Sequence, residues 1–115
     1  MTVLPILKVR FYAESTASEP VRQWLQSLPT VERKSIGADI KMVQFRWPVG
    51  LPLVRNMGNG LWEVRSHLEN RIARVLFVVR DGEMILLHGF IKKTQQTPSA
   101  ELALARKRLA MIRWG

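Results

Sequence analysis

The chain has 115 residues, of which 47% are hydrophobic and 23% are charged, and we expect one folded domain over residues 1–115. It has no cysteine and only two histidines, so we expect no disulfide, no bound metal and no cofactor. No apolar run approaches the roughly 20 residues that span a bilayer, and Met1–Pro5 lacks the apolar stretch of a signal peptide, which predicts a cytoplasmic protein without a membrane partner. The net charge of +9 favours polyanions as partners, either nucleic acid or an acidic protein.

The N-terminal part of the chain predicts a short strand followed by two helices. The strand covers Ile6–Phe11, the first helix begins near Pro20, and the second runs from Thr30 to about Trp47. The apolar sides of the two helices consist of Val21, Trp24, Leu25 and Leu28, and of Ile36, Ile40, Val43 and Trp47. Because the break at Pro29 is so short, we expect the helices to form an antiparallel hairpin.

Three strands are predicted next, over Leu61–Ser66, Ile72–Val79 and Met84–Ile91. Leu53–Asn56 is a further short candidate before them, and Asp81-Gly82 is typical of a hairpin turn between the last two. The final strand is an almost continuous apolar run. We therefore expect it to be central and buried on both faces.

A C-terminal helix is predicted from Pro98 to about Arg113, with Thr97 as its N-cap. Its expected inner side consists of Leu102, Ala105, Leu109 and Ile112. The expected fold is α+β: an N-terminal helical hairpin packed on a small, twisted, mostly antiparallel sheet, with a C-terminal helix, in the order β-α-α-β-β-β-α.

The positive charge is concentrated in the second part of the chain. Residues 1–40 contain five basic and four acidic side chains, whereas residues 41–115 contain thirteen basic and five acidic ones. The positive field therefore belongs to the strands and the last helix. A basic surface that only keeps the protein soluble explains the same charge, so the charge alone does not select the partner.

Three segments of the chain carry a family resemblance. They are Gly60-Leu61-Trp62-Glu63-Val64-Arg65, Arg74-Val75-Leu76-Phe77, and the run LHGFIKKTQQTP that ends at Pro98, followed by a helix with Glu101 and Ala105. These segments, above all the run from His88 to Pro98, resemble the HigB-type branch of the RelE/ParE toxins, and the order of elements matches over almost the whole chain. The resemblance implies a toxin that cleaves messenger RNA, often on the ribosome, and a neighbouring antitoxin, of helix-turn-helix type, that blocks it.

The residues themselves are compatible with RNA cleavage. Without a metal, the 2′-hydroxyl is the nucleophile, and the protein must move protons and neutralise a crowded phosphorane. Cations suit the second task, and an arginine holds two phosphate oxygens at once. We expect the catalytic groups on an open face of the sheet, with Glu63 as a candidate base beside Arg65, Arg74, Lys92 and Lys93. Further RNA contacts are expected from Arg55, Arg71, His67, Arg106 and Trp114.

Each of these residues also has a purely structural interpretation. Arg65 and Glu63 could form a charge pair on a solvated strand, and Arg74 could be buried and hydrogen-bonded among apolar neighbours. Lys92-Lys93 could be a solvated strand end. Within the last strand, His88 is expected to be a hydrogen-bonded core histidine. The alternation of side chains places three further aromatic residues in the core: Trp62, Phe77 and Phe90.

The position of the tyrosine departs from the family pattern. Some RelE toxins carry a tyrosine near the C-terminus as the base, but the only tyrosine here is Tyr12, outside the expected patch. This favours a mechanism in which the ribosome orients the message and the toxin supplies electrostatic stabilisation. Three function classes stay open: a ribosome-dependent endoribonuclease toxin, a ParE-like toxin that acts on DNA topoisomerase, and a basic nucleic-acid-binding module without catalysis.

Overall fold

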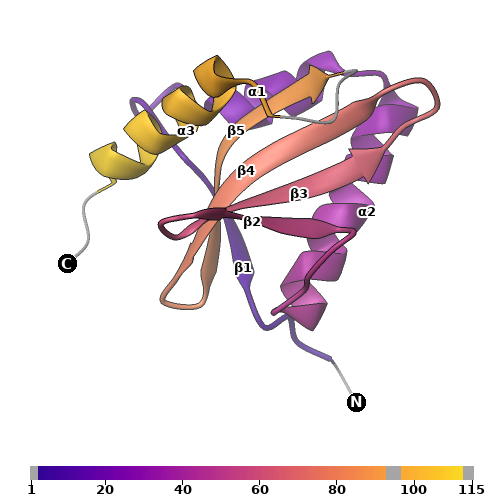
Figure 1. Cartoon of the computed structure of the whole chain (residues 1–115), viewed down its shortest axis with the longest axis horizontal. Coiled ribbons are helices and arrows are strands. Elements are labelled where there is room, and N and C mark those ends of the chain that lie inside the picture. The colour runs from indigo at the N-terminus through magenta and orange to yellow at the C-terminus, as the bar shows by residue number, and fades with distance from the viewer. Residues whose placement is uncertain (1–2, 93–96, 113–115) are drawn as a thin grey trace.

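The computed structural model describes residues 3–92 and 97–112, which form five strands and three helices (Figure 1). The elements are β1 (Lys8–Phe11), α1 (Pro20–Ser27), α2 (Thr30–Arg46), β2 (Val54–Gly58), β3 (Leu61–His67), β4 (Ile72–Arg80), β5 (Glu83–Lys92) and α3 (Ser99–Met111). The strands form one mixed sheet in the order β1-β5-β4-β3-β2, in which β1 runs parallel to β5 and the other pairs are antiparallel. None of the described helices is long and apolar enough to cross a membrane.

The predicted α+β class and mostly antiparallel sheet are confirmed, but the predicted order is one strand short. The segment Val54–Gly58 pairs with β3 as a strand of its own, so four strands lie between α2 and α3 and the order is β-α-α-β-β-β-β-α. This segment contains few apolar residues. The short candidate Leu53–Asn56 overlaps this strand, and the backbone hydrogen bonds that β3 offers hold it in extended form.

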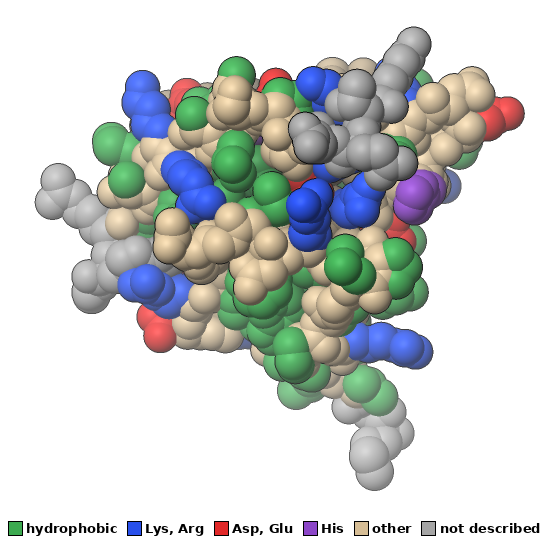
Figure 2. All heavy atoms as spheres, viewed as in Figure 1, with side chains coloured by type: hydrophobic (Ala, Val, Ile, Leu, Met, Phe, Trp, Pro, Cys, Tyr) green, Lys and Arg blue, Asp and Glu red, His purple; other side chains and the backbone are tan. Residues whose placement is uncertain are grey.

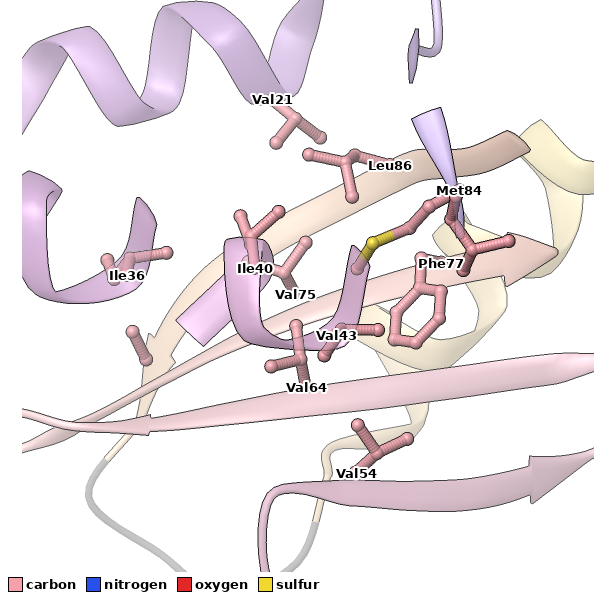
Figure 3. Close-up of a cluster of buried hydrophobic side chains, with 12 residues drawn as sticks. Val21, Ile36, Ile40, Val43, Val54, Val64, Val75, Phe77, Met84 and Leu86 are labelled. Atoms are coloured by element: carbon pink, nitrogen blue, oxygen red, sulfur yellow. The ribbon is translucent and has the colours of Figure 1, made fainter. Parts of the chain in front are cut away.

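The two N-terminal helices cover one face of the sheet (Figure 1). The helix residues in this core are those that the periodicity predicts: Val21, Ile36, Ile40 and Val43, all buried. Figure 3 shows them meeting strand residues such as Val64, Val75 and Leu86. Full burial of one such side chain contributes about 1.5–3 kcal/mol to folding. The apolar stripes therefore hold α1 and α2 on this face.

The last helix covers the opposite face of the sheet. Ala105 of α3 is fully buried there, and Leu102, Leu109 and Ile112 pack around it as predicted. The strand residues that they meet are Leu61, Leu76, Val78, Ile85, Leu87 and Phe90. Since β5 also contributes Met84 and Leu86 to the first core, it is buried on both faces, which confirms the prediction for this strand.

A β-bulge in β5 decides which face its C-terminal half presents. Leu76 of β4 pairs with His88, whereas Phe77 pairs with Leu86, so Leu87 is an extra residue. An extra residue reverses the alternation of side chains after it. His88 consequently lies on the α3 face, and Gly89 lies on the opposite face beneath the ring of Trp24.

Substituting alanine for two glycines tests this packing. A Cβ on Gly89 would lie 2.3 Å from Cε3 of Trp24, whereas a Cβ on Gly37 of α2 meets nothing within 4 Å. We expect Gly89→Ala to lower the free energy of unfolding by about 1–3 kcal/mol through overpacking. Gly37→Ala should raise it by about 0.5–1 kcal/mol through helix propensity. Urea denaturation measures both, and equal effects of the two substitutions would contradict the close approach of Trp24.

Candidate nucleic-acid interface

Two of the expected catalytic residues form a buried ion pair. The side chains of Glu63 and Arg74 are fully buried, and Nη1 of Arg74 donates a hydrogen bond to Oε1 of Glu63 at 3.3 Å. They lie on the face that α3 covers, so the predicted open face is closed at this point, because the start of α3 packs over it. Glu63 was expected beside Arg65 on the open face, and that expectation is wrong, because its side chain is fully buried. The alternative interpretation of Arg74, as a buried and hydrogen-bonded arginine, agrees with the structure.

Thr97 joins this ion pair to the start of α3. Its hydroxyl donates to Oε2 of Glu63 and accepts from Nη1 of Arg74 at 3.2 Å. The prediction that Thr97 caps the helix is wrong, since α3 begins at Ser99 with Pro98 in the N-cap position and no side-chain cap. The hydroxyl donates to a buried carboxylate, an acceptor that the free N–H groups of a helix start cannot provide. We call these three residues the Glu63–Arg74–Thr97 cluster.

The open part of this face carries the remaining strand cations. Arg65 of β3 is 16% exposed, and His67 at the end of the same strand is exposed. His67 pairs with Ile72 of β4, and Ile72 pairs with Lys92 of β5, so the half-buried Lys92 lies on the same face of the sheet as His67. Arg55 of β2 is exposed and pairs with Glu63 of β3. We call Arg55, Arg65, His67 and Lys92 the basic edge. Figure 2 shows Lys and Arg side chains gathered over β3 on this face.

Arg65 stands between the buried cluster and solvent. Its Nε lies 4.0 Å from Oε1 of Glu63, which is too long for a hydrogen bond, and this buried nitrogen has no hydrogen-bond acceptor among the described residues. The electrostatic attraction of Glu63 orients the side chain without using its donors. Arg65 is therefore the cation of the basic edge best placed to give hydrogen bonds to an incoming phosphate.

The other expected RNA contacts have structural partners or lie outside the described residues. Arg106 of α3 donates to the carbonyl oxygens of Met57 at 3.0 Å and Gly58 at 3.4 Å, which ties α3 to the end of β2. Arg71 forms an ion pair with Glu32 of α2. Of the expected residues, Lys93 and Trp114 lie outside the described residues.

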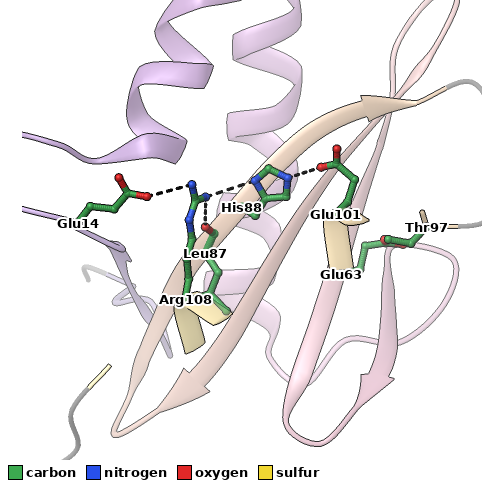
Figure 4. A network of polar contacts seen from close by, with 7 residues as sticks. All are labelled: Glu14, Glu63, Leu87, His88, Thr97, Glu101 and Arg108. Carbon is green, nitrogen blue, oxygen red and sulfur yellow. Dashed lines mark hydrogen bonds and ion pairs between the residues drawn. The ribbon is translucent and has the colours of Figure 1, made fainter. Parts of the chain in front are cut away.

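The hydrogen-bonded core histidine that the sequence predicts is present on the α3 face (Figure 4). Nε2 of His88 contacts the carboxylate of Glu101, and Nη1 of Arg108 lies 3.3 Å from Nδ1. Because a guanidinium only donates, Nδ1 must accept there, which leaves the proton on Nε2 for Glu101. Both ring nitrogens are occupied, so His88 fastens β5 to α3.

Arg108 extends this network toward the N-terminal part of the chain. Its Nη1 donates to the carbonyl oxygen of Leu87 at 2.8 Å, and its Nη2 lies 3.2 Å from the carboxylate of Glu14. Its guanidinium lies over the ring of Tyr12, 5.7 Å from the centroid. The only tyrosine of the chain is therefore part of this structural network, away from the basic edge. The sequence pattern gave no signal for Arg108, because its contacts come from segments far apart in the chain.

Within the described part of the chain, the ion pair of Arg71 and Glu32 has clearly shifted pKa values. Nε of Arg71 donates to Oε2 of Glu32 at 3.0 Å, and Nη2 donates to Oε1. These hydrogen bonds hold the pKa of the Glu32 carboxyl below its usual value and raise the pKa of Arg71. The bidentate contact holds the turn before β4 against α2, so the role of Arg71 in this structure is to stabilise the fold.

The comparisons with known proteins identify the family. Residues 23–110 match the family model described as phage derived protein Gp49-like (DUF891). The chain belongs to this Gp49-like family, which is associated with RelE-like toxins of toxin–antitoxin systems and implies an antitoxin as partner. No curated protein shows a significant match to the chain. The matched region contains the Glu63–Arg74–Thr97 cluster and the basic edge.

Removing one member of the buried pair should destabilise the protein strongly. Arg74→Met leaves Glu63 buried without its cation, which we expect to lower the free energy of unfolding by about 3–5 kcal/mol. Arg55→Met is the matched control, because Arg55 is exposed opposite Glu63 and should change the stability by less than about 0.5 kcal/mol. Urea denaturation distinguishes them. A loss below about 1 kcal/mol in Arg74→Met would refute the buried pair.

The Arg71–Glu32 pair predicts a pH dependence with a definite sign. Arg71→Ala should raise the pKa of Glu32 toward its ordinary value, which carboxyl NMR titration measures. Because the pKa of Glu32 is lowered in the folded state, the pair stabilises the fold above the unfolded pKa of about 4.3. This contribution disappears as the pH falls through the folded pKa. The thermal midpoints of the original chain and of Arg71→Ala should therefore differ at pH 7 and converge in acid.

Proposed function

We propose that this chain is a HigB-type toxin of the RelE/ParE superfamily that cleaves messenger RNA on the ribosome. The observation that carries the proposal is the basic edge: four residues from three strands share one open side of the sheet in a chain of the Gp49-like family. Cations held on neighbouring strands match the charge of a phosphodiester backbone. The sheet supplies a rigid platform for them, because β4 and β5 are buried on both faces.

In the proposed reaction, the 2′-oxygen of the RNA attacks the adjacent phosphorus and the bond from phosphorus to the 5′-oxygen breaks. A proton leaves the 2′-hydroxyl and another reaches the 5′-oxygen, so the products are a 2′,3′-cyclic phosphate and a 5′-hydroxyl. Arg65 and Lys92 stabilise the charge of the phosphorane, since a preorganised cation in a partly dry site is worth more than one in water. Stabilisation of this kind is the largest contribution that the described residues offer.

His67 is the group of the basic edge suited to proton transfer. It is exposed at the end of β3, two residues from Arg65, and an imidazole ring can both accept and donate a proton. Glu63 is fully buried behind Arg65 and orients it electrostatically, which replaces its expected role as base. The ribosome orients the message in this mechanism, and the toxin supplies cations and one proton carrier.

The proposed partner is an antitoxin of helix-turn-helix type that covers the basic edge. The edge carries three Lys or Arg side chains from the basic second part of the chain, so an acidic or amphipathic segment fits it best. We place the pair in the cytoplasm, where ribosomes and messages meet. Release of the antitoxin would then expose the cations that act on RNA.

Expression of the toxin tests this proposal. Induced expression without an antitoxin should arrest growth and cleave messages, and Arg65→Ala should slow the cleavage by about 100-fold, the usual loss when one stabilising donor is removed. Lys8→Ala is the matched control, because it removes one exposed cation from β1 at the other edge of the sheet. It should leave growth arrest and cleavage unchanged. Northern blots measure cleavage, and thermal melts confirm that both variants fold.

The other function classes give different outcomes in the same experiment. Growth arrest with intact messages and damaged DNA would establish the ParE-like class that acts on DNA topoisomerase. Harmless expression of a folded chain would establish the non-catalytic binding module. Equal loss of cleavage in Arg65→Ala and Lys8→Ala would contradict the role of the basic edge.

A further inference from the structure

A surface cavity of about 260 Å³ lies where the sheet edge meets α2. It exists because β2 begins at Val54, opposite Val64, whereas β3 continues to His67. The chain before β2 is hydrogen-bonded to β3 through the amide of Arg65, which donates to the carbonyl oxygen of Leu53 at 2.9 Å. The space left beside the end of β3 is lined by Asp39, Pro52, Leu53, Arg65 and His67. Figure 1 shows β3 ending beside α2.

The polar groups in this cavity are not used by the fold. The half-buried carboxylate of Asp39 makes no hydrogen bond or ion pair within the described part of the chain, not even with Arg65 across the same cavity. Nε of Arg65 is buried without a hydrogen-bond acceptor there, and His67 is exposed. A buried polar nitrogen without a hydrogen-bond partner, such as Nε of Arg65, is uncommon in native proteins. A cavity that holds an acceptor and two donors without pairing them therefore indicates a polar ligand.

The apolar wall and the size of the cavity restrict this ligand. Pro52 and Leu53 offer apolar surface for the face of a ring. The volume lies below the roughly 300–1,000 Å³ of pockets for drug-sized ligands, so the cavity fits one base and not several. Two of its residues, Arg65 and His67, also belong to the basic edge. A base in the cavity would thus leave its phosphate beside two of the residues that we propose to act in cleavage.

The carboxylate decides between the four bases. An ionised carboxylate only accepts hydrogen bonds, and its two oxygens take two parallel N–H groups. Guanine offers that pair from N1–H and its 2-amino group. Adenine and cytosine offer an amino group next to an accepting ring nitrogen, and uracil offers one N–H between two carbonyl groups. Only guanine therefore matches Asp39 with both oxygens.

We propose that this cavity is a subsite for one guanine nucleotide of the RNA, with the base between Asp39 and the Pro52–Leu53 wall and its phosphate on Arg65 and His67. The inference deepens the proposed function and rests on it for the assignment of RNA as the natural ligand. It assigns Asp39 as a specificity residue, which neither the family pattern nor the charge of the chain indicates. Cleavage is then favoured next to a guanine.

Titration of the folded chain with GMP, AMP, CMP and UMP tests the subsite without requiring cleavage. We expect GMP to bind about 10-fold or more tightly than AMP, the size of preference that one bidentate contact to a base gives. Asp39→Asn should abolish this preference, because the amide replaces one acceptor by a donor. His67→Ala should weaken all four nucleotides by a similar factor, because it contacts the phosphate. NMR shifts of His67 and of the Leu53 methyl groups report binding at the cavity itself.

Asp81→Asn is the matched control. Asp81 is exposed in the turn between β4 and β5 at φ 52°, a conformation that asparagine tolerates, and the substitution removes the same charge as Asp39→Asn. Both variants should bind every nucleotide phosphate slightly more tightly, but only Asp39→Asn should lose the guanine preference. Equal affinities for GMP and AMP, or a preference that survives in Asp39→Asn, would overturn the subsite. Message cleavage by a chain without guanine preference would overturn the subsite and leave the proposed function standing.

Discussion

The docking of α3 through the Glu63–Arg74–Thr97 cluster is the interaction on which the rest of the structure depends. A buried carboxylate and a buried guanidinium are costly unless they are paired and hydrogen-bonded. Here each partner has the other, and Thr97 supplies one donor and one acceptor to them. The start of α3 can satisfy this pair in one position only. The helix then covers half of the sheet face and leaves the other half, with the basic edge, open to solvent.

The bulge in β5 gives this face its second attachment. If the side chains of β5 alternated without the bulge, His88 would point toward α1, where Trp24 packs on the backbone of Gly89. With it, His88 reaches Glu101 and Arg108 of α3, so the helix is held at both ends by polar groups and along its middle by the apolar core around Ala105. The bulge thus meets two packing requirements at once. It places His88 on the α3 face, and it places Gly89, which has no side chain, beneath Trp24 on the other face.

The same arrangement divides the cations into those that make contacts within the fold and those of the basic edge. Arg74, Arg106 and Arg108 are used inside the fold, and Arg71 fastens the turn before β4 to α2. The cations of the basic edge are spared, and Arg65 is oriented by Glu63 without being hydrogen-bonded to it. The charge available to an RNA is therefore smaller than the net charge of the chain indicates, but it is concentrated at the end of β3. That concentration is what a site for a phosphodiester needs.

The sequence by itself determined the α+β class, the apolar sides of the three helices and the double-sided burial of β5, because periodicity and apolar runs report burial directly. It also indicated that His88 is a core residue and that the charge lies in the second part of the chain. Only the tertiary structure decided that β2 is a strand, that Thr97 binds the sheet and that Glu63 and Arg74 are buried together. These features depend on which segments meet in space. The sequence pattern of a strand does not show whether a basic residue in it is covered by a helix or exposed to water. Here the position of α3 decides which basic residues are buried.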